Sequence, residues 1–141
     1  GHSKVVRELL MQRDIDVNAK SYRGLASLFV ACEGNHVEVV RELLKHANVD
    51  FNAKNNSGNT ALTVACRSGR AEVVRELLKH DDMDVNAKDS TGNTSLFVAS
   101  RDGRVGIARV FCPHGQLVAR HCRTGAGRWH SAAVGGLADV P

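Results

Sequence analysis

The side chains best suited to metal chemistry stand near the carboxyl end of the sequence. Cys112 and His114 are two residues apart, and His121 is adjacent to Cys122. Two thiolates and two imidazoles are a ligand set that zinc accepts, but this spacing matches none of the common zinc patterns. Cys112 also aligns with Leu44 in an earlier copy of a repeated segment, which favours packing. We therefore predict no metal site, and a metal or thiol site in this tail is the alternative.

Nucleophilic catalysis is not indicated either, because a serine or cysteine nucleophile needs an oriented base beside it. Cys32 and Cys66 lie in apolar segments with no base nearby in the sequence, and we interpret them as small buried thiols. The sequence has no glycine-rich phosphate loop, no paired-carboxylate motif and no Walker-type lysine. We predict that this segment is not an enzyme and uses no cofactor.

The composition is typical of a folded protein. Hydrophobic residues make up 43% of the sequence and charged residues 24%, and no apolar run approaches the roughly 20 residues that span a bilayer. The sequence opens without a basic-then-apolar leader, and its cysteines fit a reducing compartment. We expect an intracellular protein, with the cytoplasm as the first expectation and the nucleus as the alternative.

The positive charge is concentrated in the last quarter of the sequence. Residues 1–104 carry 15 Lys and Arg against 14 Asp and Glu, a balance of +1, whereas residues 105–141 carry four Arg against one Asp, a balance of +3. A basic surface that binds nucleic acid would need an excess of positive charge in the repeated part of the chain. We therefore predict no nucleic-acid partner and no membrane partner.

The sequence repeats itself with a period of 34 residues. EVVRELLKH occupies residues 38–46 and again 72–80, and VVRELL already occupies residues 5–10. Three turn glycines, from Gly24 to Gly92, follow the same period. One pair of short helices cannot bury its apolar face alone, whereas stacked copies cover one another. The sequence therefore predicts a helical repeat protein.

Each copy contains a turn followed by a first helix. The turn glycines are free to adopt positive φ, and Thr60 and Thr94 follow them as predicted N-caps. In the first copy Ala26 replaces that threonine. We therefore expect Ser27 to cap this helix one residue later and the start of the helix to be looser.

The second helix of each copy is predicted to be amphipathic and to follow a left-handed stop. Gly69 and Gly103 suit that stop, and Asn35 takes the same position in the first copy. Apolar residues fall on one face of the helix and charged residues on the other. The predicted buried face comprises Val73, Val74, Leu77 and Leu78, and the predicted outer face comprises Glu72, Arg75, Glu76 and Lys79.

The segment GNTALTVACRSGRAEVV, at residues 58–74, resembles the ankyrin repeat, whose pattern is G-x-T-P-L-H-x-A-A-x-x-G-H-x-E-V-V. It has Ala61 in place of the proline and Thr63 in place of the histidine, and Phe29 and Phe97 hold the histidine position in the other copies. We expect the threonine–histidine hydrogen bonds of the family to be replaced by apolar packing in all three. The resemblance implies an all-α fold, an ankyrin-type solenoid of stacked helix-turn-helix repeats with hairpin loops.

The repeat divides the chain into five parts. Residues 1–20 form the second half of a repeat, residues 21–54 and 55–88 form full repeats, and residues 89–121 form a repeat that degenerates after residue 105. Residues 122–141 fit a partial, degenerate repeat. For residues 105–141 as a whole, an unrelated or disordered tail is the alternative. Because both ends fall inside a repeat and no polar capping unit is present, we expect a segment of a longer array.

The resemblance also implies where a partner binds, since hairpin tips and the ends of the first helices line a concave groove in similar proteins. These positions differ between the copies, and tyrosine and arginine are good anchors. The alternative is that exposed loops simply vary. The predicted partner-binding residues are Tyr22, Arg23, Leu25, Glu33, Asn56, Ser57, Asn59, Arg67, Ser68, Ser90, Thr91, Asn93, Arg101 and Asp102.

Two further columns of residues recur at 34-residue spacing. We interpret the arginine column as a solvated face balanced by glutamates, with a grip on an acidic partner as the alternative. We expect the asparagine column to bond turn backbone between repeats, and the resemblance adds hydroxylation as a secondary role. The columns are Arg7, Arg41, Arg75 and Arg109, and Asn18, Asn52 and Asn86.

The functional prediction is a non-catalytic module for protein–protein interaction. Its concave groove would be presented to a protein partner that the sequence does not name. The alternative is a regulatory or targeting segment of a larger enzyme or signalling protein.

Overall fold

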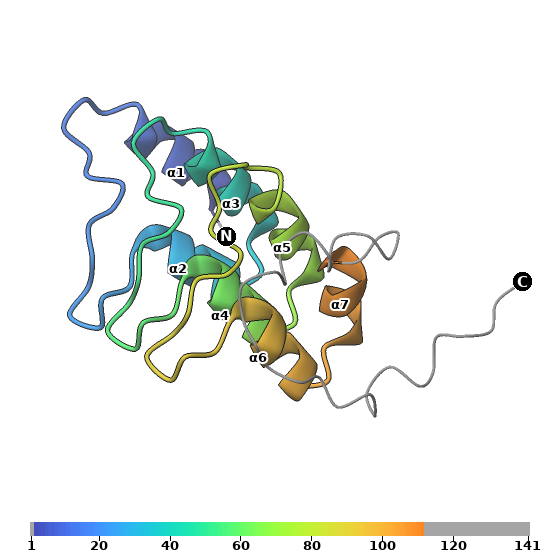
Figure 1. The fold of residues 1–141 in the computed structure, drawn as a ribbon. Coiled ribbons are helices and arrows are strands. Elements are labelled where there is room, and N and C mark those ends of the chain that lie inside the picture. Colours follow the sequence, from blue (N-terminus) through green and yellow to red (C-terminus); the bar gives the residue numbers. More distant parts are fainter. Residues whose placement is uncertain (1, 112–141) are drawn as a thin grey trace, which may run out of the picture.

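The computed structural model describes residues 2–111 of the chain (Figure 1). Within this range the backbone forms seven short α-helices and no sheet, apart from one isolated antiparallel bridge between Lys88 and Thr94. The helices are α1 (Ser3–Leu10), α2 (Ser27–Glu33), α3 (Val37–Leu44), α4 (Ala61–Arg67), α5 (Ala71–Leu77), α6 (Ser95–Arg101) and α7 (Val105–Phe111).

The helices stack in two rows. Helices α2, α4 and α6 form an inner row, helices α1, α3, α5 and α7 form an outer row, and long hairpin loops project from one side of the stack (Figure 1). Each helix contacts its neighbours in the same row, and the pairs α2 with α3, α4 with α5 and α6 with α7 pack within their own repeats. The predicted all-α solenoid of helix pairs is therefore confirmed over the described residues. Of the part predicted to be degenerate, residues 105–141, residues 105–111 form α7, and residues 112–141 lie outside the described residues.

The turn glycines adopt the backbone conformation that the sequence predicts. Gly24, Gly58 and Gly92 have φ values of 72°, 72° and 81°. Gly58 also needs to be small, because an added Cβ would lie 2.6 Å from the backbone nitrogen of Ser90 in the next turn. Around Gly92 there is open space. Glycine is therefore favoured at this position for two separate reasons. The backbone is left-handed in both turns, and at Gly58 the next turn also packs closely against it.

The predicted helix stops and two of the predicted caps are also present. Asn35 has φ of 57°, close to the values at its glycine counterparts. Thr60 and Thr94 accept hydrogen bonds from the backbone N–H groups at the third positions of α4 and α6. The prediction for Ser27 was wrong, because α2 begins at Ser27 itself and Ala26 is its N-cap, without a side-chain bond. Backbone geometry therefore sets the start of this helix even where the capping side chain is missing.

The core lies between the two rows of helices. Val73, Val74 and Leu77 of α5 are fully buried, as their spacing predicts, and they join a cluster that runs from α1 to α7. The prediction for Glu76 was wrong, since it is only 9% exposed. Its carboxylate lies between Arg41 and Lys79, at 3.0 Å and 2.9 Å. The ion pairs shield this side chain from solvent, which an isolated helix would not do.

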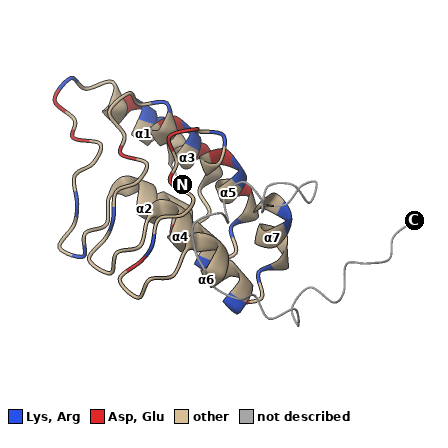
Figure 2. Ribbon diagram, viewed as in Figure 1, with Lys and Arg blue, Asp and Glu red and all other residues tan. Residues whose placement is uncertain are grey.

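The outer face carries a ladder of ion pairs between repeats. Arg7 lies 2.8 Å from Glu42, and Arg41 repeats the contact with Glu76 one repeat later. Positive and negative residues accordingly alternate along α1, α3 and α5 (Figure 2). The hydrogen bond from Arg7 lowers the pKa of Glu42 to about 2. The predicted solvated face balanced by glutamates is confirmed, with its contacts made between repeats as well as within a helix.

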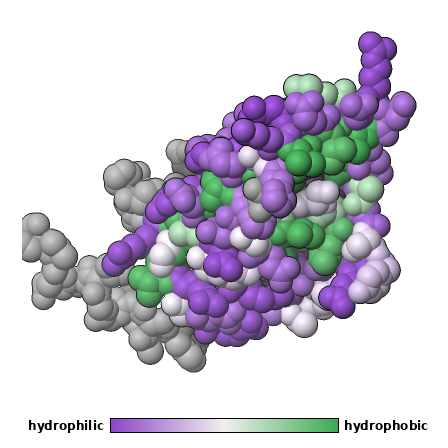
Figure 3. All heavy atoms as spheres, turned by 180° about the vertical axis from the view of Figure 1, so that it is seen from behind, coloured by the Kyte–Doolittle hydropathy of each residue, from purple (hydrophilic) through white to green (hydrophobic). Residues whose placement is uncertain are grey.

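Exposed apolar side chains gather in the first part of the chain. Apolar surface is visible from behind at the end of the stack that holds α1 and α2 (Figure 3). In this region the large exposed hydrophobic residues are Val5, Leu9, Met11, Ile15, Tyr22 and Val30. The corresponding valine and leucine positions of α3 and α5 are buried, so position in the stack decides their exposure.

Candidate interaction surface

The hairpin turns are joined to one another along the stack. The side-chain amide of Asn56 donates to the carbonyl of Tyr22 at 3.0 Å, and the backbone of Asn56 donates to Arg23 at 3.4 Å. One repeat later, the N–H of Ser90 donates to Ser57 at 3.2 Å. These predicted contact residues therefore form one continuous row of turn tips. The row is held by backbone bonds, which keep its exposed side chains at fixed spacing.

Tyr22 is the most exposed large side chain of this row. Its ring is 84% exposed, and the guanidinium carbon of Arg23 lies 5.3 Å from the ring centre. This distance is within the range of a cation–π contact. Tyr22 therefore presents a large apolar face with a charged group beside it, as an anchor for a partner would.

Each turn is closed by the side chain at its first position, which the sequence analysis did not single out. Asn55 Oδ1 accepts hydrogen bonds from the backbone of Ser57 and Asn59, at 2.9 Å and 3.0 Å. Asp89 Oδ1 makes the same bonds to Thr91 and Asn93, both at 2.9 Å. The hydroxyl of Thr91 adds a further bond, which is the main cause of the lowered pKa of Asp89. The signal for this role was the Asn or Asp three positions before Gly58 and Gly92. Before Gly24 the same position is Ser21, whose hydroxyl accepts from the N–H of Leu25 at 3.3 Å.

Not every predicted contact residue is available to a partner. Asn59 is only 5% exposed, and its Oδ1 accepts from Arg67 Nη2 at 2.9 Å, so it supports the neighbouring arginine. Leu25 is half-buried and packs beside Phe29 and Ala53. Asn59 is thus a correction to the predicted surface. Its side chain turns inward because the arginine at the end of α4 provides a donor there.

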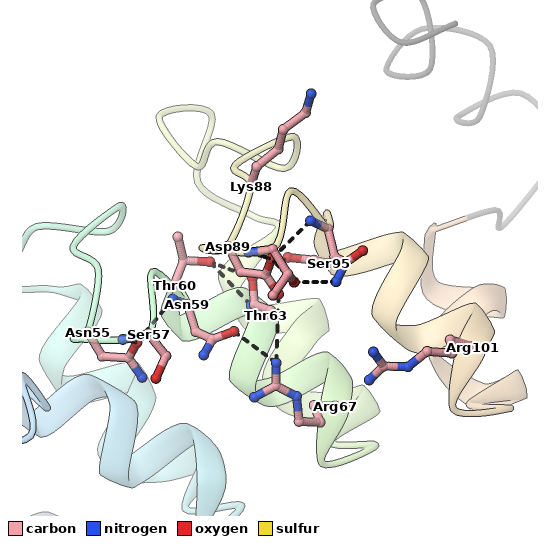
Figure 4. A network of polar contacts seen from close by, with 12 residues as sticks. Asn55, Ser57, Asn59, Thr60, Thr63, Arg67, Lys88, Asp89, Ser95 and Arg101 are labelled. Atoms are coloured by element: carbon pink, nitrogen blue, oxygen red, sulfur yellow. Dashed lines mark hydrogen bonds and ion pairs between the residues drawn. The ribbon is translucent and has the colours of Figure 1, made fainter. Parts of the chain in front are cut away.

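The ends of the inner helices carry exposed polar residues. Arg67 is half-buried at the end of α4 and lies 4.0 Å from Asp89 (Figure 4). Arg101 ends α6, and its Nε donates to Asp102 Oδ1 at 2.8 Å. This bond is the main cause of the lowered pKa of Asp102. Glu33 is exposed at the end of α2, and Ser68 is half-buried after α4.

Two arginines that the sequence analysis missed connect these helix ends. Arg70 Nε donates to the carbonyl of Glu33 at 3.2 Å, and Arg104 Nε donates to the carbonyl of Arg67 at 3.1 Å. Each arginine thus reaches back by one repeat to the end of the preceding inner helix. The signal was present in RSGR and RDGR, where an arginine follows the stop glycine at the same spacing.

The middle of the stack holds a chain of buried hydroxyl groups. Thr63 Oγ1 lies 3.1 Å from Thr60 Oγ1 and 3.0 Å from Ser95 Oγ of the next repeat (Figure 4). The prediction of apolar packing was therefore wrong for this copy. It is confirmed for the first copy, where Phe29 is 2% exposed and packs against Ala26. It was also wrong for the third copy, where Phe97 is 42% exposed. The hydroxyl of Thr63 thus forms a hydrogen bond between repeats at the position where the family pattern has a histidine.

The predicted asparagine contacts between repeats are confirmed at two positions. Asn18 donates to the carbonyl of Asn48 at 2.7 Å and accepts from the N–H of Asp50 at 2.8 Å. Asn52 makes the same two bonds to Asp82 and Asp84 one repeat later, both at 2.8 Å. Each asparagine thus satisfies both a donor and an acceptor of the next loop. A role in hydroxylation stays a prediction.

Comparison with known families decides what this repeated architecture is. The family model for ankyrin repeats in three copies matches residues 1–89 and, in a second match, residues 28–121. The chain belongs to the ankyrin repeat family. A search of curated proteins found no match to the sequence. Ankyrin repeats are generally protein–protein interaction modules and are typically non-catalytic.

The cysteines of the ankyrin inner helices are buried. Cys32 and Cys66 are free thiols, and burial raises the pKa of each to about 12. A thiol with so high a pKa has almost no thiolate at neutral pH and is a poor nucleophile. Within residues 2–111, no group of three His, Cys, Asp or Glu side chains is arranged to hold a metal ion. Cys112, His114, His121 and Cys122, the alternative metal or thiol site, lie outside the described residues.

The length of the ankyrin helices bears on membrane association. Over the described part of the chain, every helix is too short and too polar to cross a bilayer.

Proposed function

We propose that this ankyrin array binds a protein partner through its inner surface, which we define as the turn tips and the ends of α2, α4 and α6. The observation that carries the proposal is the row of hydrogen bonds between repeats, which holds exposed and unlike side chains at fixed spacing. A surface ordered before binding loses less conformational entropy when a partner docks. The outer helices repeat almost the same sequence and offer less to distinguish one partner from another.

Among the predicted contact residues, the exposed ones define the binding surface. Tyr22 and Arg23 would act as anchors at the first turn, with Arg67 and Arg101 at the helix ends. The remaining proposed contacts are Glu33, Asn56, Ser57, Ser90, Thr91, Asn93 and Asp102, with Leu25 and Ser68 contributing at the edges. Asn59 is buried and accepts a hydrogen bond from Arg67 of this surface.

A capture experiment with a matched control tests the proposal. The chain is immobilised as wild type and as the variant with Tyr22→Ala, Arg67→Ala and Arg101→Ala. The control combines Arg75→Ala with Arg109→Ala, which removes the same number of positive charges, but from the outer helices. We expect the inner-surface variant to lose proteins that both wild type and control retain. Capture of the same proteins by all three chains, each shown to be folded by circular dichroism, would contradict the proposal.

A further inference from the structure

Four arginines gather at the edge where the inner helices meet the outer ones. Arg67 and Arg101 end α4 and α6, and Arg70 and Arg104 lie in the loops that follow. We call these four residues the arginine edge. Positive residues are concentrated at the end of α6 and in the loop leading to α7 (Figure 2). Arg67 and Arg101 extend from neighbouring helices on the same side of the molecule (Figure 4).

Each guanidinium of the arginine edge is held by one nitrogen and keeps other donors available. Arg70 and Arg104 use only Nε, which donates to a backbone carbonyl of the preceding repeat. Arg101 also uses Nε, whereas Arg67 uses Nη2. For the remaining nitrogens no hydrogen bond is recorded within the described residues. A guanidinium fixed in this way loses little side-chain entropy when it binds an anion.

The carboxylates near the arginine edge do not balance it. Asp89 is half-buried, with a side chain that is only 6% exposed, and its Oδ1 accepts hydrogen bonds from its own turn, although its other oxygen lies 4.0 Å from Arg67. Asp102 is the nearest accessible carboxylate, and three positive side chains lower its pKa, namely Arg101, Arg104 and Arg67. Three arginines beside two aspartates leave a local excess of one positive charge, in an array whose charges otherwise nearly cancel.

The excess of positive charge increases along the stack, because the first copy has other residues at the positions of the four arginines. Glu33 stands where Arg67 and Arg101 stand in later copies, and His36 stands where Arg70 and Arg104 stand. The inner surface therefore changes from an acidic residue beside α2 to two arginines for each of α4 and α6. A bound chain that carries negative charge at one end would fit in one direction only.

We infer that the arginine edge binds an acidic protein segment, whose Asp or Glu carboxylates lie across the ends of α4 and α6. The inference rests on the proposed function and names the chemistry of its partner. Arginine forks match carboxylates, and the same two arginine positions recur at the ends of α4 and α6, so that more than one carboxylate of the segment can be bound. Nucleic acid is disfavoured because residues 1–104 carry almost equal positive and negative charge.

A binding assay with defined peptides tests this inference. The full chain is titrated into a fluorescein-labelled peptide of Glu, Gly and Ser, and into a matched peptide with Gln at each Glu, with fluorescence anisotropy as the readout. The variant Arg101→Gln with Arg104→Gln should weaken binding of the acidic peptide by about tenfold or more. The control Arg75→Gln with Arg109→Gln removes the same charge from the outer helices, and its affinity should stay within about twofold of wild type.

Three results would overturn the inference. Equal weakening of peptide binding in both variants would show a general charge effect. Equal affinity for the Glu and Gln peptides would show that the chain does not recognise carboxylates. Tighter binding of single-stranded DNA or of a phosphorylated peptide would assign another ligand. A Kd that rises with salt for wild type but much less for the arginine-edge variant supports the inference. If no acidic peptide binds while the inner-surface variant of the capture experiment still loses captured proteins, the proposed function stands and this inference fails.

Discussion

Helices α1 and α3 contain the same hexapeptide, VVRELL, and yet they differ in burial. In α1 the first valine and first leucine, Val5 and Leu9, are 57% and 51% exposed. In α3 the equivalent residues, Val39 and Leu43, are 8% and 2% exposed. The two helices have the same local sequence and the same helical form. The difference therefore comes from what surrounds each helix.

Neighbouring helices explain the contrast. Helix α3 lies between α1 and α5 in the outer row and also packs against its inner partner α2, whereas α1 packs chiefly against α3. The sequence pattern thus determines which face of a helix is apolar, and stacking determines whether that face leaves water. Because hydrophobic stabilisation scales with the area removed from water, the repeats of this chain contribute unequally to its stability.

The largest expected effect comes from removing one leucine at equivalent positions of two helices. Leu77 of α5 is fully buried, and Leu77→Ala should destabilise the chain by about 2–5 kcal/mol because it leaves a cavity. Leu9→Ala in α1 should cost less than about 1 kcal/mol, since that side chain is half exposed. Urea unfolding followed by circular dichroism measures both. Equal losses would mean that burial in the stack does not govern the contribution of a repeat.

An intermediate effect is expected at the turn glycines. Gly58→Ala and Gly92→Ala both place a Cβ on left-handed backbone, which costs about 1–2 kcal/mol. Only Gly58→Ala also meets the backbone of Ser90, whereas Gly92 faces open space. We therefore expect Gly58→Ala to lower the thermal midpoint further than Gly92→Ala. A smaller loss for Gly58→Ala would show that contact between turns is not important for stacking.

The smallest expected effect is the acid sensitivity of the ion-pair ladder. The pKa of Glu42 is about 2 and that of Glu76 is also lowered, in each case chiefly by an arginine of the preceding repeat. A carboxyl with a lowered folded-state pKa contributes its stabilisation fully above its unfolded-state pKa and loses it as the pH falls towards the folded-state value. Stability should thus decline between about pH 5 and about pH 2.

Substitution separates the ladder from other acid effects. Glu42→Gln should flatten the decline, because the ion pair with Arg7 is then absent at every pH. Arg75→Gln, on the exposed face of α5, serves as the control because it removes an outer-face charge without touching the Arg7–Glu42 pair, and it should leave the slope as in wild type. Urea unfolding at a series of pH values gives the two slopes. A Glu42→Gln chain with the wild-type slope would show that this pair does not couple the repeats.

The parts of the fold that depend on local rules could be predicted from the sequence. Turn glycines, left-handed stops and threonine caps need particular residues at particular backbone angles, so Gly58, Asn35 and Thr60 were assigned correctly. Ser27 and Glu76 were assigned wrongly because each depends on a neighbouring repeat. The stack holds Ala26 in the extended conformation of a cap, and Arg41 covers the carboxylate of Glu76.

The sequence could predict where exposed and unlike side chains lie, whereas their role in binding a partner stays a prediction. Variation between copies indicated the turn tips and helix ends, and the structure places Tyr22 and Arg101 in exposed positions there. It did not indicate that Asn59 faces inward, nor that Arg70 and Arg104 reach back across a repeat boundary. Such contacts join residues 8 or 37 positions apart, so the recurrence of an arginine after Gly69 and Gly103 marks these residues without showing what they contact.

Hydrogen exchange in the native chain tests most directly the claim that neighbours give each repeat its order. The VVRELL segments of α1 and α3 have the same intrinsic exchange rates, apart from the effect of the residue before each, so different protection reports their surroundings. We predict that the amides of α1 exchange at least about a hundredfold faster than those of α3, with α5 as slow as α3. Equal protection in α1 and α3 would contradict the account, because the hexapeptide would then be ordered without a neighbour on each side.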